Sequence, residues 1–335
     1  MTKLKILAAG LALAFSAVAI PASSAVYVVA HPDDDILLMG PNFIGDITGA
    51  YPTVVIILTA GDAGNGHGAT SANGSASGQY NNLNQQYYRI RMNARQDAIF
   101  PWVTSASKAA SGYHYWTQAD ESFGGTIRQV ERFFLGNIVE YHLNLPDDVE
   151  GGSTKLTNFL NGGPTATITD ILGRNTYTQA SLKETIRQII ARNNRAVPTL
   201  VVNFPDFRQG MGDHPDHTTT GQFVNDAINQ GAGYGCMWQA IYPGYSIAGQ
   251  RENSNLSETQ RLGYERLHKT LLNGGNITPI VGGLITAQNH PTWVPTTSLF
   301  PTTNLQKGTM DQFHTGFYGR NYFRGEHPLN QSCAF

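Results

Sequence analysis

Residues 26–34 read VYVVAHPDD, and this stretch indicates how the chain folds. A run of β-branched and aromatic residues, typical of a buried strand, is followed at once by a histidine, a proline and two aspartates. Further buried strands are expected over residues 54–59, 199–203 and 237–242. Helical patterns lie between them, over residues 81–100, 181–190 and 218–228. Strands that alternate with helices predict an α/β domain with a mostly parallel sheet.

Sequence patterns that predict secondary structure are clearer in some segments of the chain than in others. Ser181 and Glu184 have the spacing of a capping box, which predicts that a helix starts there. Residues 103–150 show no regular pattern. Residues 246–335 are rich in Gly, Asn, Thr and Pro, with one helix expected over 257–272. We therefore expect one domain over residues 26–245 and a loop-rich C-terminal extension, residues 246–335, packed on the same domain.

The first 25 residues read as a secretory signal peptide. Lys3 and Lys5 give the positive start, residues 6–20 are apolar or small, and small residues follow Pro21. The apolar run is shorter than the roughly 20 residues that span a bilayer, so an uncleaved membrane anchor is the weaker alternative. Cleavage near Val26 removes both lysines and changes the formal net charge from −2 to −4. We expect a secreted or periplasmic protein with no integral membrane segment after cleavage.

Composition excludes two classes of protein. There are 22 Lys+Arg against 24 Asp+Glu, so no basic footprint for nucleic acid is visible. With 41% hydrophobic residues the chain is also not intrinsically disordered. Its only cysteines, Cys236 and Cys333, form an even pair that predicts one disulfide in an oxidising compartment, or else two buried thiols.

Two short clusters carry the chemistry. The first is His31-Pro32-Asp33-Asp34, and the second is His214-Pro215-Asp216-His217. Each follows an expected strand and precedes an expected helix. Ligands bind outside the carboxyl ends of the strands in open α/β sheets, so both clusters can reach one crevice. Either cluster alone could be only a hydrogen-bonded loop with a helix cap, but the two together favour a site.

The residue types in these clusters are those of a metal site. Two histidines and one aspartate supply three protein ligands and leave a fourth position open, as in catalytic zinc sites. Nitrogen and oxygen ligands without thiolates also accept another divalent transition metal. The remaining carboxylates and histidine can then act as base, acid and orienting group around a metal-activated water.

These clusters resemble the two signature motifs of the PIG-L/LmbE-like N-deacetylases, which are zinc-dependent enzymes that remove acyl groups from glucosamine-type sugars. Residues 58–64, LTAGDAG, and residues 143–147, LNLPD, are similar to further segments of that family. The resemblance covers roughly residues 26–245 and implies a Rossmann-like three-layer sandwich. It implies the following zinc ligands: His31, Asp34 and His217.

The resemblance also implies roles for other residues. Asp33 would be the general base, and His214, oriented by Asp216, would stabilise the oxyanion or protonate the departing amine. Arg91 matches an arginine that contacts substrate hydroxyls in the family, although Ala94 stands where the family commonly has a glutamate. That departure concerns the identity of the substrate and not the hydrolysis.

We therefore expect an exported zinc-dependent hydrolase that removes an N-acyl group, commonly acetyl, from an amino sugar, either a small molecule or part of a glycan or glycoconjugate. One alternative is a metal-dependent amidase acting on a non-sugar amide. Another is a secreted carbohydrate-binding protein without catalysis on the same scaffold. The sequence leaves the oligomeric state open.

Overall fold

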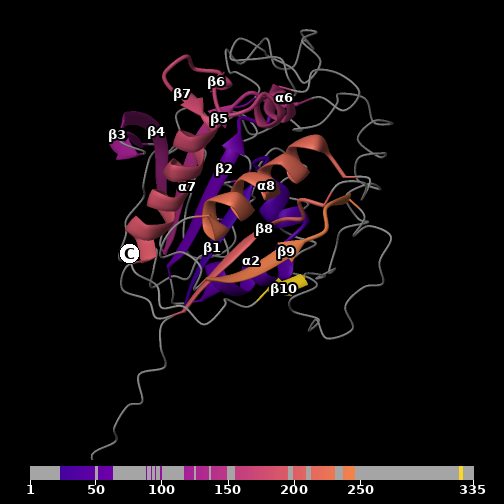
Figure 1. The fold of residues 1–335 in the computed structure, drawn as a ribbon. Coiled ribbons are helices and arrows are strands. Elements are labelled where there is room, and N and C mark those ends of the chain that lie inside the picture. Colours follow the sequence, from indigo (N-terminus) through magenta and orange to yellow (C-terminus); the bar gives the residue numbers. More distant parts are fainter. Residues whose placement is uncertain are drawn as a thin grey trace, which may run out of the picture.

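The structure is a computed structural model that describes these parts of the chain: residues 23–49, 52–62, 117–123, 126–135, 137–148, 155–194, 199–208, 213–230, 237–245 and 324–326, with Tyr88, Met92, Arg95 and Ile99. The strands of its main sheet are β1 (Ser23–Val29), β2 (Thr53–Thr59), β3 (Thr117–Phe123), β4 (Thr126–Leu135), β5 (Ile138–Leu145), β8 (Thr199–Pro205), β9 (Trp238–Tyr242) and β10 (Arg324–Glu326). The helices with described bounds are α1 (Asp34–Leu37), α2 (Gly40–Thr48), α6 (Lys155–Asn161), α7 (Gln179–Asn194) and α8 (Pro215–Asn229). A small separate ribbon consists of β6 (Thr167–Thr169) and β7 (Thr176–Thr178) (Figure 1).

The strand order across the main sheet is β10-β9-β8-β1-β2-β5-β4-β3. The strands from β9 to β5 run parallel to one another. At one edge β10 pairs antiparallel with β9, and at the other edge β4 and β3 are added antiparallel. The mostly parallel α/β sheet expected from the sequence is therefore confirmed.

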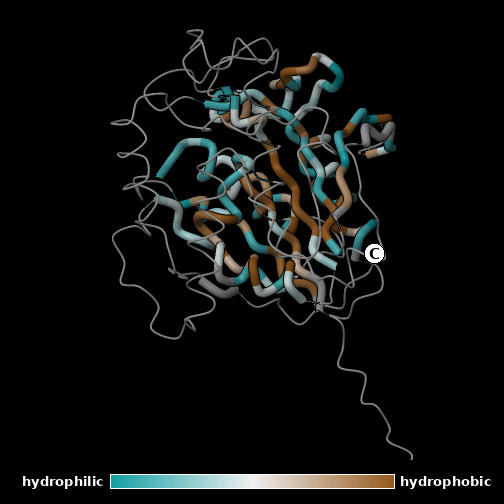
Figure 2. Tube along the Cα trace, turned by 180° about the vertical axis from the view of Figure 1, so that it is seen from behind, coloured by the Kyte–Doolittle hydropathy of each residue, from teal (hydrophilic) through white to brown (hydrophobic). Residues whose placement is uncertain are grey.

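Strand β1 lies at the centre of the parallel part. Val26 is in register with Val54 of β2 on one side and with Val202 of β8 on the other. Residues 25–30 and 53–60 are buried throughout, which explains their nearly unbroken apolar sequence (Figure 2). The residues that follow β1 are consequently held in the middle of the sheet's carboxyl edge.

Helices cover both faces of the sheet. On one face Val26 and Val28 pack in a core with Ile186 of α7 and Phe223 of α8, and these two helices lie in front of the sheet in Figure 1. On the opposite face the ring of Tyr27 meets that of Phe43 in α2 edge to face, with 5.1 Å between ring centroids. Alternate residues of one strand thus contact different helical layers, which makes a three-layer arrangement.

Residues 103–150, whose sequence is less regular than the rest, contain β3, β4 and β5 in their described part, and the sequence did not predict these strands. Strand β5 reads IVEYHLNL, with Glu140, His142 and Asn144 at alternate positions. All three are buried. Charged and polar residues at every second position obscured a strand that is in fact internal to the sheet.

Helix α7 begins earlier than predicted. It starts at Gln179, and the reciprocal capping contacts join Thr178 and Ser181. The Ser181 backbone N–H donates to Thr178 Oγ1 at 3.2 Å, and the Thr178 N–H donates to Ser181 Oγ at 2.9 Å. Ser181 is therefore the third helical residue and not the cap, while the Glu184 carboxylate accepts from Arg187 one turn further on.

Several expectations concern residues outside the described part: Arg91, Cys236, Cys333, the helix over 257–272, and residues 1–22 of the expected signal peptide. Ser23–Ala25, the last three residues of that peptide, belong to β1. Of the expected C-terminal extension, Arg324–Glu326 joins the sheet as β10.

None of the described helices has the length and apolar character of a membrane span.

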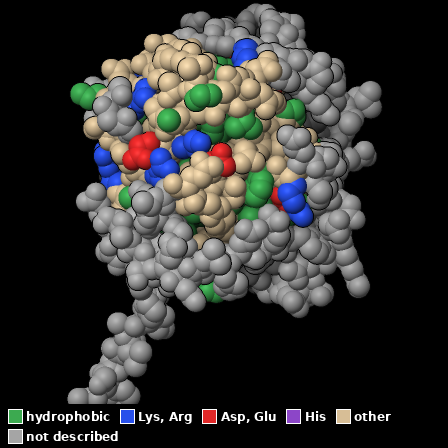
Figure 3. All heavy atoms as spheres, in the orientation of Figure 1, with side chains coloured by type: hydrophobic (Ala, Val, Ile, Leu, Met, Phe, Trp, Pro, Cys, Tyr) green, Lys and Arg blue, Asp and Glu red, His purple; other side chains and the backbone are tan. Residues whose placement is uncertain are grey.

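In Figure 3, basic and acidic side chains of the described part lie beside one another on the face shown.

Candidate metal centre

The first cluster forms the turn between β1 and α1. After Val29 the chain leaves the sheet, and the backbone N–H groups of Ile36 and Leu37 both donate to the carbonyl oxygen of Asp33. Asp33 is thus the N-cap of α1, although its side chain makes no capping hydrogen bond. The Asp34 carboxylate turns back, and its Oδ2 accepts the His31 backbone N–H at 2.7 Å. The turn therefore holds His31 and Asp34 against each other.

The second cluster forms the start of α8. His214 is the N-cap, in extended backbone conformation, and its Nδ1 accepts the backbone N–H of Asp216 at 3.2 Å. Pro215 occupies the first helical position, where a missing N–H costs nothing. His217 then lies within the first turn, and neither its side chain nor that of Asp216 is exposed.

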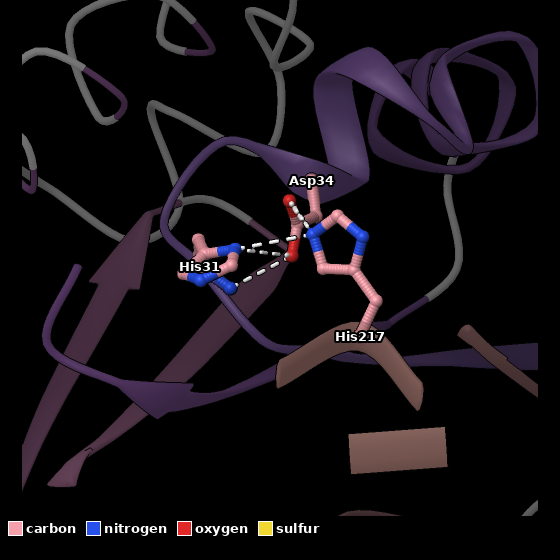
Figure 4. Close-up of side chains that lie close together, drawn as sticks. All are labelled: His31, Asp34 and His217. Carbon is pink, nitrogen blue, oxygen red and sulfur yellow. Dashed lines mark hydrogen bonds and ion pairs between the residues drawn. The ribbon is translucent and has the colours of Figure 1, made fainter. Parts of the chain in front are cut away.

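The two clusters meet at three side chains. His31 Nδ1 lies 3.1 Å from His217 Nε2, and His217 Nε2 lies 3.1 Å from Asp34 Oδ1. One ligand atom from each residue lies within 4.8 Å of the others, and all three residues are buried (Figure 4). Two nitrogens and one carboxylate oxygen that face one another in this way fit a divalent metal with an open coordination position.

The outer nitrogens of both imidazoles face carboxylates. His31 Nε2 lies 2.9 Å from Asp147 Oδ1 and 3.2 Å from Asp216 Oδ2. His217 Nδ1 lies 2.7 Å from Asp213 Oδ1. A carboxylate on the outer nitrogen of a metal-binding histidine fixes the ring and its tautomer, leaving the inner lone pair for the metal. The supporting contacts therefore agree with the metal-binding assignment.

The charged side chains around the site favour the binding of a cation. Burial alone would lower the pKa of His217, but the carboxylates of Asp34 and Asp213 raise it to about 10. Burial and the neighbouring Asp147 raise the pKa of Asp216 to about 8. Burial together with the charges of His31 and His217 lowers the pKa of His214 to about 4. Burial would likewise lower the pKa of His31, but the carboxylates of Asp147 and Asp34 raise it. Carboxylates thus hold protons on both histidines of the His31–Asp34–His217 group, and a metal ion would take the place of those protons.

A second group overlaps the first. His31, His214 and Asp216 also have ligand atoms within 4.8 Å of one another. The buried Asp216 Oδ1 has no hydrogen-bond partner among the described residues. These features belong to the same centre, because His31 is common to both groups.

Asp216 contacts His214 through its backbone and not through its carboxylate. Its carboxylate lies 3.9 Å from His214 Nδ1, too far for a hydrogen bond, while Oδ2 lies 3.2 Å from His31 Nε2. It is the backbone N–H of Asp216 that holds the His214 ring.

Asp33 is buried on the turn between His31 and Asp34, and Arg91 lies outside the described residues.

Sequence reasoning missed three acidic residues that support the site: Asp62, Asp147 and Asp213. Asp147 follows β5 and contacts His31, and its backbone N–H donates to Asp62 Oδ1 at 2.9 Å. One feature of the sequence could have indicated such residues, namely the position of aspartates after strands. An aspartate follows the carboxyl end of β1, β2, β5 and β8. Without knowledge that β5 is a strand, Asp147 could not be given this place.

Comparison with known proteins gave structural neighbours alone. No protein-family profile matches the chain, and no curated protein matches it in sequence. Among solved structures, the N,N'-diacetylchitobiose deacetylase from Pyrococcus horikoshii is 12% identical with a TM-score of 0.46, over 91% of this chain and 84% of that one. The zinc-inhibited form of a teicoplanin deacetylase is 11% identical with a TM-score of 0.43, over 92% and 100% of the two chains. The A40926 pseudoaglycone deacetylase is 10% identical with a TM-score of 0.42, over 92% and 98%.

Proposed function

We propose that the protein is a metal-dependent hydrolase that removes an N-acyl group from an amino sugar. The observation that supports this most directly is the convergence of His31, Asp34 and His217, each histidine carrying a carboxylate on its outer nitrogen. An amide is a weak electrophile with a poor leaving group. A bound zinc ion, or another divalent transition metal, would polarise the carbonyl and acidify water.

The remaining residues of the two clusters divide the proton transfers. Asp33, on the turn between two ligands, is the proposed general base that takes a proton from the attacking water. His214 Nδ1 accepts a backbone N–H, so in the neutral ring Nε2 carries the hydrogen. His214 is thereby a hydrogen-bond donor suited to a developing oxyanion, and a protonated ring would serve the departing amine. Asp216 supports His31 through its side chain and His214 through its backbone.

The resemblance to the PIG-L/LmbE-like deacetylases supports the amino-sugar substrate and the use of Arg91 as a sugar contact. The signal-peptide pattern supports an extracellular or periplasmic glycan or glycoconjugate. Two other activities use the same residues differently. A metal-dependent amidase would act on a non-sugar amide, and a carbohydrate-binding protein would bind the sugar without hydrolysis.

The test is release of acetate and free amine from N-acetylglucosamine and chitooligosaccharides by zinc-reconstituted protein. We expect Asp33→Asn to lower kcat by about 10²–10⁴-fold with zinc still bound, because only the base is lost. His217→Ala should lose both zinc and turnover. Asp226→Asn is a matched control, since Asp226 lies about 14 Å further along α8 at 1.5 Å per residue and pairs with Lys183.

The outcomes separate the three functions. Turnover that Asp33→Asn and His217→Ala abolish and Asp226→Asn retains would establish the sugar deacylase. Bound zinc with hydrolysis confined to non-sugar amides would establish the amidase instead. Sugar binding that is indifferent to Asp33→Asn, without any turnover, would identify a binding protein, and absence of zinc binding would refute the metal centre.

A further inference from the structure

Asp213 connects His217 to a segment that neither sequence cluster includes. Its Oδ1 accepts from the His217 ring at 2.7 Å, from the His214 backbone N–H at 2.8 Å and from the Tyr245 backbone N–H at 3.1 Å. Tyr245 lies three residues beyond the end of β9, in a different part of the chain from the start of α8. Three donors on one buried oxygen fix the carboxylate in a single orientation.

Gly244 provides the space that this orientation needs. A Cβ atom at residue 244 would overlap the Asp213 carboxylate, so any side chain there would displace it. The other carboxylate oxygen, Oδ2, has no hydrogen-bond partner among the described residues and lies toward Gly244. The requirement for glycine is therefore steric and specific to one side chain.

The next residue contacts the same histidines through its ring. Tyr245 meets the His217 ring edge to face, with 5.0 Å between centroids and 80° between planes. Its centroid is 6.3 Å from that of His214. Gly244 and Tyr245 thus act on His217 in two ways, through the Asp213 carboxylate and through direct packing.

We propose that Gly244-Tyr245 is a positioning segment that sets His217 in its metal-binding tautomer through Asp213. With Asp213 as acceptor, Nδ1 keeps its hydrogen, and Nε2 would present its lone pair to a metal ion held together with His31 and Asp34. The inference rests on the proposed metal centre and assigns to it a fifth strand end, that of β9. Asp213 and Gly244 are positioning residues, because neither reaches the three ligand atoms itself.

A purely structural role for Asp213 makes a different prediction. An acidic residue just before a helix stabilises the positive end of the helix dipole, and its loss would lower stability without changing the histidine ring. The two roles are separated by the hydrogen bond from His217 Nδ1–H to Asp213, which nitrogen-15 and proton NMR of the imidazole observe in metal-free protein.

The experiment compares wild-type protein, Gly244→Ala, Asp213→Ala and the control Gly45→Ala. Gly45 lies in α2 with nothing within 4 Å of an added Cβ, so it matches the chemical change without the clash. Zinc affinity is measured by competition with a chromophoric chelator, and the His217 signals are assigned with His217→Ala. We expect Gly244→Ala and Asp213→Ala to bind zinc about 10–100-fold more weakly and to lose the hydrogen-bonded Nδ1–H signal of His217, with Gly45→Ala unchanged.

Two outcomes would overturn the inference. One is wild-type zinc affinity and an unchanged Nδ1–H signal of His217 in Gly244→Ala. If that variant did not fold, the same result in Asp213→Ala, which adds no bulk, would overturn it equally. Failure of wild-type protein to bind zinc or another divalent transition metal would refute the proposed function separately, since the NMR comparison is made without metal.

Discussion

His31 is the residue on which most of the site converges. Its Nδ1 faces His217, and its Nε2 faces Asp147 and Asp216, so both edges of one small ring have polar partners. Asp147 is held in turn by Asp62 through its backbone N–H. One imidazole is therefore oriented from the ends of three other strands, β2, β5 and β8. This leaves the ring a single orientation, in which Nδ1 faces His217 Nε2.

Asp147 is expected to orient the His31 ring for metal binding. Asp147→Ala removes the acceptor nearest to His31 Nε2, and we expect zinc affinity to fall about 10–100-fold because the ring loses its orienting partner. Chelator competition measures the change, with Asp226→Ala as the control on α8. Equal zinc affinity in both variants would show that Asp216 alone orients His31.

At the scale of elements, the distance between α8 and β8 decides where His217 lies. Gly221, one turn after His217, packs directly on the backbone at the end of β8. A Cβ there would overlap the Pro205 carbonyl oxygen and lie 3.1 Å from the Phe207 backbone nitrogen. Backbone atoms cannot rotate aside as a side chain can, so the helix itself would have to move.

Gly221→Ala is therefore expected to lower the free energy of unfolding by about 1–3 kcal/mol, the usual cost of overpacking. Urea denaturation measures this, and Gly45→Ala in α2 provides the matched substitution without a clash. The same variant should bind zinc more weakly, because displacement of α8 moves His217 away from Asp34. Unchanged stability would mean that α8 is not seated on β8 as described.

Across the whole molecule, the two faces of the sheet are stabilised differently. The α7–α8 face is apolar, whereas the opposite face buries an ion network around Arg95. The guanidinium pairs with Asp35 of α1 and with Glu140 of β5, and Glu140 Oε2 lies 3.2 Å from His142 Nε2. None of these three charged side chains is exposed. The network joins the turn that carries Asp34 to the centre of the sheet.

Arg95→Met should destabilise the fold by about 3–5 kcal/mol, because it leaves two buried carboxylates without their cation. Arg187→Met is the control, since Arg187 forms a surface pair with Glu184 and such pairs contribute about 0–1 kcal/mol. Urea denaturation at neutral pH compares the two variants. Similar losses in both would show that the buried network contributes no more than a surface pair.

The acidic and polar residues of β5 explain why the sequence did not predict that strand. Glu140 and His142 at alternate positions resemble a solvated face, yet Arg95, which is distant in sequence, pairs with Glu140, and Glu140 in turn contacts His142. The error at α7 was smaller, since Thr178 and Ser181 form a reciprocal cap of the same kind three residues earlier. Local pattern predicts helix and strand type well where one face is uniformly apolar, and poorly where a partner elsewhere compensates the charge.

Sequence alone predicts the parallel strands β1, β2, β8 and β9 and places each histidine cluster after a strand. These features depend on local apolar runs and on the carboxyl-edge rule for α/β sheets. The folded structure was needed to show which carboxylate supports which histidine, including Asp147 with His31 and Asp213 with His217. Those pairings depend on strand order and on the space left by Gly244, and side-chain contacts between distant strand ends leave no periodic signal in the chain.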